Sequence, residues 1–389
     1  MSTWFVASSS RLFATGDGGT RWRSTYIKQW RGGNIWSLTF SSAKVGVADV
    51  GGSPLYRTED GGLTWSTIPL SAVTHSASAT VDDFPTSGPV GPFGGSWRSL
   101  PAHVALPAGA EVTGLSCPSA TSCVAIDNHG RAATFDGRSW SPGRTVDGAA
   151  LEGVSCAPML CAAVDGQGDV IVRRQGEWSS PQAALPGGAE DVSCSGGSCV
   201  AVGRSGAAVL GPKGWAGHEL PGVALDEGSC TGRAFCLALG PDGVAEVYDG
   251  RGWSPAPPSV PAGARPLELM AESCGEPTFC VVVEPEGRVS FFLGNGWVTS
   301  TSPGWGSGAL PFDPVEVSCY GPTLCAAANR DSVVSVLSMA GWLGPSVVGA
   351  SRAPIFTSCP GPGACIALDG TGSTYRYMTA EGAQGASER

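Results

Sequence analysis

One pattern of apolar and polar positions recurs seven times between residues 112 and 378, at a period of roughly 40 residues. Each copy holds a short strand ending in Ser-Cys, four or five residues, a second Cys opening an apolar strand, a Gly-rich turn and another strand. All but the last copy then reach a Gly-x-Trp phrase or a close variant. No segment keeps a helical period, and the dense Gly and Pro would interrupt one. The pattern therefore predicts an all-β chain.

A period in this range, built only of strands and turns, is typical of a β-propeller with one four-stranded blade per repeat. The last copy lacks its terminal Trp strand, whereas an orphan phrase, GGSWRSLP with Trp97, precedes the first copy. Donating that strand to the last blade would close the ring and remove two exposed sheet edges. We therefore predict seven blades with overlap closure over residues 92–378.

The first 70 residues carry related strands without Cys. Two phrases there, RLFATGDGGTRW and LYRTEDGGLTW, place a Thr-x-Asp-Gly-Gly turn before a Trp. This segment is either the remnant of a preceding ring or a set of extra blades in one ring of about nine. Residues 71–91 are rich in Ser, Thr, Pro and Gly and are predicted to be a linker, which favours the first alternative. Residues 379–389 are predicted to be a disordered tail.

All 14 cysteines lie in the seven copies, two in each. Facing residues of a hairpin lie close enough for a disulfide, so each pair is predicted to join the first two strands of one blade. The pairs are Cys117 with Cys123, Cys156 with Cys161, Cys194 with Cys199, Cys230 with Cys236, Cys274 with Cys280, Cys319 with Cys325, and Cys359 with Cys365. Zinc binding and reduced buried thiols are the alternatives, but zinc needs four ligands at compact spacing and the four His follow no matching register. We expect structural disulfides, no metal, and an extracellular or cell-surface location.

The composition of the chain argues against some classes of binding partner. The net charge is −10 and only 14% of residues are charged, which argues against a nucleic-acid groove or an anionic membrane surface. No apolar run reaches the length of a membrane span. The chain opens within a repeat and shows no signal peptide, so we expect either an incomplete N-terminus or a ring excised from a longer protein. We expect a monomer without a cofactor.

The two Thr-x-Asp-Gly-Gly phrases and the Ser-Cys copies resemble the Asp-box (BNR-repeat) propeller superfamily, which includes sialidases, sortilin-type receptors and photosystem II stability/assembly factor-like proteins. The Cys-containing copies are also similar to repeats of secreted actinobacterial propellers of unassigned function. The resemblance implies that the Asp side chain caps backbone N–H groups in the turn between the third and fourth strands. It implies a structural role for Thr15, Asp17, Gly19, Trp22, Thr58, Asp60, Gly62 and Trp65.

The same resemblance raises glycoside hydrolysis as an activity. Sialidase-type chemistry needs an Arg cluster, a Tyr nucleophile paired with Glu, and an acidic proton donor. None of the six Tyr lies in a recognisable catalytic phrase, and the Arg-Ile-Pro-like signature is absent. We therefore expect no enzymatic activity, with a sialidase-like hydrolase or lyase as the alternative.

Blade topology places the inter-blade connections and the second-to-third strand turns on one face. The turns begin with acidic residues that predict an acidic channel mouth: Asp127, Asp165, Glu284 and Asp369. These residues are either good turn formers or a site for a cation or basic ligand.

Two neighbouring inter-blade connections are long, and the second carries Trp305, Phe312 and Asp313. Trp305 either contacts a ligand or fills a gap between two blades. Together these features predict a non-catalytic extracytoplasmic binding or scaffold propeller that recognises a protein or a glycan through its long loops. An architectural domain of a larger surface protein is a further alternative.

Overall fold

The computed structural model divides the chain into two compact units, Met1–Ala77 and Ser78–Arg389. It describes residues 4–8, 11–15, 21, 23–27, 35–40, 46–50, 55–58, 60, 62–67, 95–256, 271–284, 288–294, 296–301, 314–322, 324–338, 341–349 and 354–379. Within these residues, no helix is long and apolar enough to cross a membrane. The two units are described separately below.

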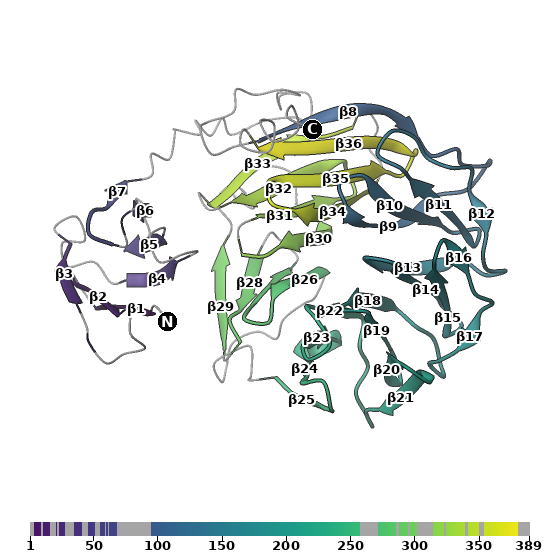
Figure 1. Cartoon of the computed structure of the whole chain (residues 1–389), viewed down its shortest axis with the longest axis horizontal. Helices are drawn as coiled ribbons and strands as arrows, with labels where there is room; N and C mark the ends of the chain where they lie inside the picture. The colour runs from purple at the N-terminus through teal and green to yellow at the C-terminus, as the bar shows by residue number, and fades with distance from the viewer. Residues whose placement is uncertain are drawn as a thin grey trace. The chain divides into compact units, whose positions relative to one another are not determined.

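The larger unit is a seven-bladed β-propeller, with its sheets arranged around a common axis (Figure 1). Blade 1 comprises β9 (Val112–Ser119), β10 (Ser122–Asp127), β11 (Arg131–Phe135) and β12 (Arg144–Thr145). Blade 2 comprises β13 (Leu151–Ala157), β14 (Leu160–Asp165), β15 (Asp169–Arg174) and a split outer strand, β16 (Glu177–Trp178) and β17 (Gln182–Ala183). Blade 3 comprises β18 (Asp191–Ser195), β19 (Ser198–Gly203), β20 (Gly206–Gly211) and β21 (Gly214–Glu219).

Blade 4 comprises β22 (Glu227–Cys230), β23 (Cys236–Leu239), β24 (Ala245–Tyr248) and β25 (Trp253–Pro255), with a short 3-10 turn at Pro241–Gly243. Blade 5 comprises β26 (Ala271–Glu276), β27 (Phe279–Val283), β28 (Arg288–Phe292) and β29 (Trp297–Thr301). Blade 6 comprises β30 (Pro314–Tyr320), β31 (Leu324–Asn329), β32 (Val333–Ser338) and β33 (Gly341–Val347). Blade 7 comprises β34 (Ile355–Gly361), β35 (Ala364–Asp369), β36 (Ser373–Thr379) and β8 (Gly95–His103).

The ring closes through β8, as the orphan Trp97 phrase predicts. This strand pairs antiparallel with β36 and places Trp97 opposite Tyr377. The first strands of the seven blades contact one another in order, and β34 contacts β9 to complete the circle. The ring therefore has seven blades rather than nine.

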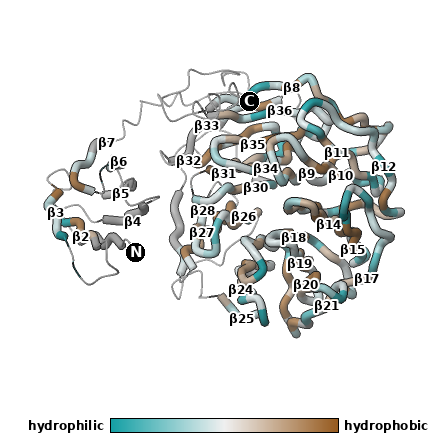
Figure 2. Tube along the Cα trace, viewed as in Figure 1, coloured by the Kyte–Doolittle hydropathy of each residue, from teal (hydrophilic) through white to brown (hydrophobic). Residues whose placement is uncertain are grey.

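The second strand of each blade is buried on both faces, which explains its unbroken apolar sequence. Every residue of β14 and β31 is buried, and their sequences are LCAAVD and LCAAAN. Figure 2 shows hydrophobic colours along β14 and β15 in the middle of blade 2. Small Ala side chains on both faces allow neighbouring blades to approach closely here.

Seven hydrophobic clusters fill the seven blade boundaries, and each joins two successive blades. At six boundaries a Trp from the outer part of the later blade packs against the cluster: Trp140, Trp178, Trp215, Trp253, Trp297 and Trp97. Trp140 also donates a hydrogen bond from Nε1 to Thr374 Oγ1 of blade 7 at 2.8 Å. The Trp of the recurring Gly-x-Trp phrase thus packs into the outer part of the blade boundaries.

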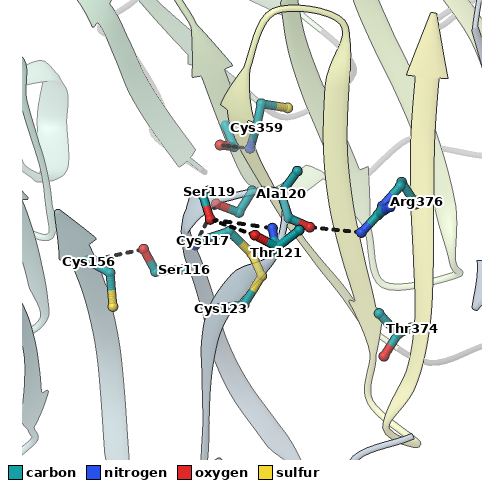
Figure 3. The surroundings of a disulfide bond; sticks show 12 residues. Ser116, Cys117, Ser119, Ala120, Thr121, Cys123, Cys156, Cys359, Thr374 and Arg376 are labelled. Carbon is teal, nitrogen blue, oxygen red and sulfur yellow. Dashed lines mark hydrogen bonds between the residues drawn. A yellow bond between two sulfur atoms is a disulfide. The ribbon is translucent and has the colours of Figure 1, made fainter. Parts of the chain in front are cut away.

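All seven predicted disulfides are present, and no cysteine is free. Each joins the first and second strands of one blade across a sequence separation of five or six residues. Figure 3 shows the bridge between Cys117 and Cys123. Closing loops this short stabilises each blade by about 2 kcal/mol in the chain-entropy account.

The smaller unit contains two sheets without Cys. One comprises β1 (Trp4–Ser8), β2 (Arg11–Thr15) and β3 (Arg23–Tyr26), and the other β4 (Ile35–Phe40), β5 (Gly46–Val50), β6 (Leu55–Thr58) and β7 (Ser66–Thr67).

In the turn before β7, Asp60 Oδ1 accepts hydrogen bonds from the backbone N–H groups of Leu63 and Thr64 and from Thr58 Oγ1. Burial alone would raise the pKa of Asp60, but hydrogen bonds, chiefly from Thr64, lower it to about 2. Trp65 Nε1 donates to the Gly62 carbonyl. In the first phrase, Thr15 ends β2, whereas Asp17, Gly19 and Trp22 lie outside the described residues.

Candidate functional site

The candidate site is the axial channel of the propeller. The free edges of the seven first strands line it. Each first strand lies at the end of its sheet and pairs on one edge only. Its other edge faces the axis, where backbone N–H groups have no partner within the sheet. Such groups need another acceptor when they are buried.

Serine hydroxyls supply that acceptor at every blade boundary. The Ser that precedes the first Cys of one blade accepts a hydrogen bond from the backbone N–H of the first Cys in the next blade, at 2.8 to 3.0 Å. The donors and acceptors are Cys156 to Ser116, Cys194 to Ser155, Cys230 to Ser193, Cys274 to Ser229, Cys319 to Ser273, Cys359 to Ser318, and Cys117 to Ser358. Figure 3 shows the bond between Ser116 and Cys156. These seven bonds, which we call the serine ring, link all the blades around the axis.

Four carboxylates lie beside the serine ring, on successive blades 3 to 6. Asp191, Glu227 and Glu316 each stand three positions before the first Cys of their blade, on β18, β22 and β30. Glu272 stands two positions before its Cys, on β26. We call these four residues the channel carboxylates. Asp191 repeats the geometry of the serine ring, because its Oδ2 accepts a hydrogen bond from the Gly228 backbone N–H of the next blade at 3.1 Å.

Burial raises the pKa of every channel carboxylate, and repulsion from Asp191 adds to this effect in Glu227, Glu272 and Glu316. Burial raises the pKa of Asp191 to about 6, against the opposing effect of hydrogen bonds from Gly228 and Val192. Burial and then the charge of Asp191 raise the pKa of Glu316 to about 8. Burial, followed by repulsion from Asp191, Glu316 and other acidic neighbours, raises the pKa of Glu227 well above its usual range.

Glu272 is the most enclosed of the four, with 7% of its surface exposed. Burial and then the charge of Asp191 raise its pKa well above the usual range, partly offset by the Ser229 backbone amide. Neither carboxylate oxygen accepts a hydrogen bond of standard geometry within the described part of the chain.

The repulsion acts across the channel itself. Asp191 belongs to blade 3 and Glu316 to blade 6, so no single blade boundary brings them together. Both residues lie on first strands, whose free edges face the axis, so the interaction is consistent with carboxylates that meet across the channel. Asp191, Glu227 and Glu316 remain partly exposed, whereas Glu272 is buried.

The surroundings of the acidic residues in the second-to-third strand turns differ from those of the channel carboxylates. Asp127 Oδ1 accepts hydrogen bonds from the backbone N–H groups of His129 and Arg131. Asp165 and Asp369 cap their own turns in the same way, and Asn329 does so in blade 6. These contacts support the turn-forming interpretation of the acidic residues.

Enclosure also limits what these turn residues could bind. Asp127, Asp165 and Asp369 are buried, with 4%, 1% and 1% of their surfaces exposed. Glu284 is fully buried and accepts a hydrogen bond from Ser290 Oγ at 2.7 Å. The cavity beside Asp127, lined by Val104, Leu106 and Arg131, has a volume of about 10 Å³. That volume accommodates no more than a single water molecule.

Among the described tyrosines, Tyr375 forms a hydrogen bond to a carboxylate, as a catalytic Tyr would. Its hydroxyl donates to Asp369 Oδ2 at 3.0 Å. Burial, together with the charge and hydrogen bond of Asp369, raises the pKa of Tyr375. A raised pKa disfavours the phenolate form that a nucleophile needs. The predicted contact residues Trp305, Phe312 and Asp313 lie outside the described residues.

Sequence reasoning did not identify the serine ring or the channel carboxylates as features. A signal was present, because Ser precedes the first Cys in all seven copies. In four copies an acidic residue also stands two or three positions before this Cys, in EDVSC, DEGSC, AESC and VEVSC. The predicted channel mouth of turn residues is distinct from this inner acidic wall.

Comparisons with known proteins show the fold. No family model and no curated protein matches the chain. The structure titled "Crystal structure of RRP9 WD40 repeats" is 11% identical with a TM-score of 0.58, covering 72% of this chain and 97% of that one. "Structure of U3-55K" is 12% identical with a TM-score of 0.57, covering 75% and 100%. "YCF48 bound to D1 peptide" is 14% identical with a TM-score of 0.57, covering 79% and 100%. At these identities the likeness extends to the propeller architecture alone.

Proposed function

We propose that this protein is a non-catalytic, extracytoplasmic binding or scaffold propeller that recognises a protein or glycan through its inter-blade loops. The observation that carries the proposal is the double fastening of the ring. Every blade holds a disulfide, and every blade boundary holds a serine-ring bond. A platform fastened in this way presents its loops with little loss of conformational entropy on binding.

The location and the partner class have separate support. Disulfides in every blade suit an oxidising environment outside the cytoplasm. Propellers of similar fold include one with a bound peptide, YCF48 with the D1 peptide. For this chain we propose a protein as the first partner class to test and a glycan as the second.

The absence of catalysis is part of the proposal. Asp127, Asp165 and Asp369 use their carboxylates to cap turns, which leaves them poorly placed to act on a sugar. Tyr375 is buried and has a raised pKa. Chromogenic sialosides and other aryl glycosides should therefore show no turnover above the buffer rate, and steady turnover lost in Asp369→Asn would refute this part.

Binding is tested on peptide, envelope-protein and glycan arrays with the whole chain. Trp305→Ala should abolish specific array signals, and Trp305→Phe should retain part of them. Met159→Ala is the matched control, because this side chain is 84% exposed in the loop between Cys156 and Cys161. Loss of signal in the Met159 variant but not in the Trp305 variant would contradict the proposed surface.

A further inference from the structure

We infer that the axial channel binds an organic cation, an ammonium or guanidinium group, on its side formed by blades 3 to 6. Asp191, Glu227 and Glu316 occupy one register position on three first strands and define this side. The charge of Asp191 on blade 3 raises the pKa of Glu316 on blade 6 although blades 4 and 5 lie between them, which is consistent with first-strand carboxylates that face the same axial space. The inference concerns the channel and is independent of the loop surface proposed above.

Glu272 supplies a separate observation that points to a ligand. It comes from a different register position and is 7% exposed, and neither of its oxygens accepts a standard hydrogen bond within the described residues. The charge of Asp191 on blade 3 raises the pKa of Glu272, and the charge of Glu272 raises the pKa of Glu227 on blade 4, so Glu272 lies near these two carboxylates. The Ser229 backbone amide offsets this burial only in part. A buried carboxyl without hydrogen bonds of standard geometry is costly, and a bound donor would satisfy it.

In the part of the chain that the structure describes, no Lys or Arg forms an ion pair with this group. The nearby Arg204 pairs with Glu190 at 2.8 Å, and its charge also reaches Asp226 at the start of blade 4. An external cation would therefore supply the opposite charge for the channel carboxylates.

The opposite side of the channel is uncharged at the same register. Blades 1, 2 and 7 present Gly114, Gly153 and Phe356 there. In blade 7, Thr357 donates its hydroxyl to the Ala326 carbonyl. Glu152, one position before Gly153, is exposed. A channel acidic on one side and neutral on the other suits a cation carried on an apolar stem, as in a lysine side chain or a polyamine.

A chelated metal ion fits less well than an organic cation. The described residues contain no group of three or more His, Cys, Asp and Glu arranged to hold a metal. The carboxylates are close enough to repel one another but are spread over four blades. An extended amine can reach several of them through separate N–H donors, whereas one metal ion cannot.

Protonation links this binding to pH. The titratable groups of the first strands in blades 3 to 6 include the four channel carboxylates. Asp226 interacts with Glu190 and Arg204 just before β22, and the exposed Glu152 lies on β13. Because the pKa values of the channel carboxylates are raised, part of the group holds protons near neutral pH. A cation must displace those protons, so binding should release protons and tighten as pH rises.

The test is isothermal titration calorimetry of the whole chain with spermine and, separately, with N-acetyl-trilysine amide, at about 0.15 M salt. Affinity should rise by about ten-fold or more between about pH 6 and about pH 9, and buffers of different ionisation enthalpy should reveal proton release. Spermine binding alone would identify free polyamines as the source, and peptide binding alone would identify a protein segment.

Variants locate the site. Glu272→Gln and Glu316→Gln should each weaken binding by about ten- to hundred-fold, because each removes one charge-assisted hydrogen bond. Glu177→Gln is the matched control, since this exposed carboxylate pairs with Arg144 on the outer strands and its loss changes the net charge equally.

Three results would overturn the inference: neither amine binds, the Glu272 and Glu177 variants bind equally, or calcium binds in the channel with the same dependence on Glu272. None of these bears on the array experiments, so a failure here is distinguishable from a failure of the proposed loop function. Unchanged melting of each variant at about pH 5 confirms that the ring is intact.

Discussion

Replacing Glu316 by Gln should stabilise the propeller at alkaline pH and leave it unchanged in acid. The pKa of Glu316 is about 8 in the folded protein, against 4.5 for an ordinary Glu, with burial as the largest cause. The folded state therefore holds a proton that the unfolded state releases between these two values. The stability from this group is complete below about pH 4.5 and is lost as pH rises through about 8.

The size of the effect follows from the same pKa. A rise from 4.5 to about 8 corresponds to at most about 5 kcal/mol in the free energy of unfolding. Glu316 is partly exposed and shares its repulsion with Asp191, so we expect about 1–3 kcal/mol. Gln has the shape of the protonated acid and never ionises, so Glu316→Gln avoids this loss.

Thermal unfolding monitored by circular dichroism, from about pH 5 to about pH 9, measures the difference. The Tm of the Glu316→Gln variant should equal that of the wild type near pH 5 and exceed it by about 2–8 °C near pH 9. Glu177→Gln should show no such divergence, because Glu177 is exposed on the outer strand. A Tm difference between the Glu316 variant and the wild type that is constant across this pH range would refute the argument.

Three further predictions concern the fastening of the ring. Ser193→Ala leaves the Cys230 backbone N–H without its acceptor and should lower the free energy of unfolding by about 1–2 kcal/mol; an unchanged denaturation midpoint would show that water replaces the hydroxyl. Replacing Cys156 and Cys161 together by Ser should lower the free energy of unfolding by about 2 kcal/mol relative to the wild type under oxidising conditions. After reduction the difference from the wild type should disappear, and an equal difference under both conditions would contradict a disulfide contribution. A chain beginning at residue 95 should fold as a cooperative propeller, whereas one beginning at residue 105 lacks β8 and should melt earlier and aggregate by exposing the edge of β36; indistinguishable melting would argue against closure by this strand.

Much of the architecture could be predicted because its determinants are local. The Cys pairs are five or six residues apart, so hairpin geometry alone brings them together. The repeat length and the Trp phrase define a blade, and the missing last Trp strand points to Trp97 as its replacement. The apolar second strands are recognisable from sequence because both of their faces are buried.

The candidate site depended on contacts that local patterns do not specify. Six bonds of the serine ring join residues 37 to 46 positions apart, and the seventh joins Cys117 to Ser358 across 241 positions. The sequence by itself determined the blades, the disulfide in each blade and the order of the blades. Only the closed ring brings Asp191 close enough to Glu316 for its charge to raise the pKa of Glu316, because the rotation of each blade about the axis sets which side chains come near one another.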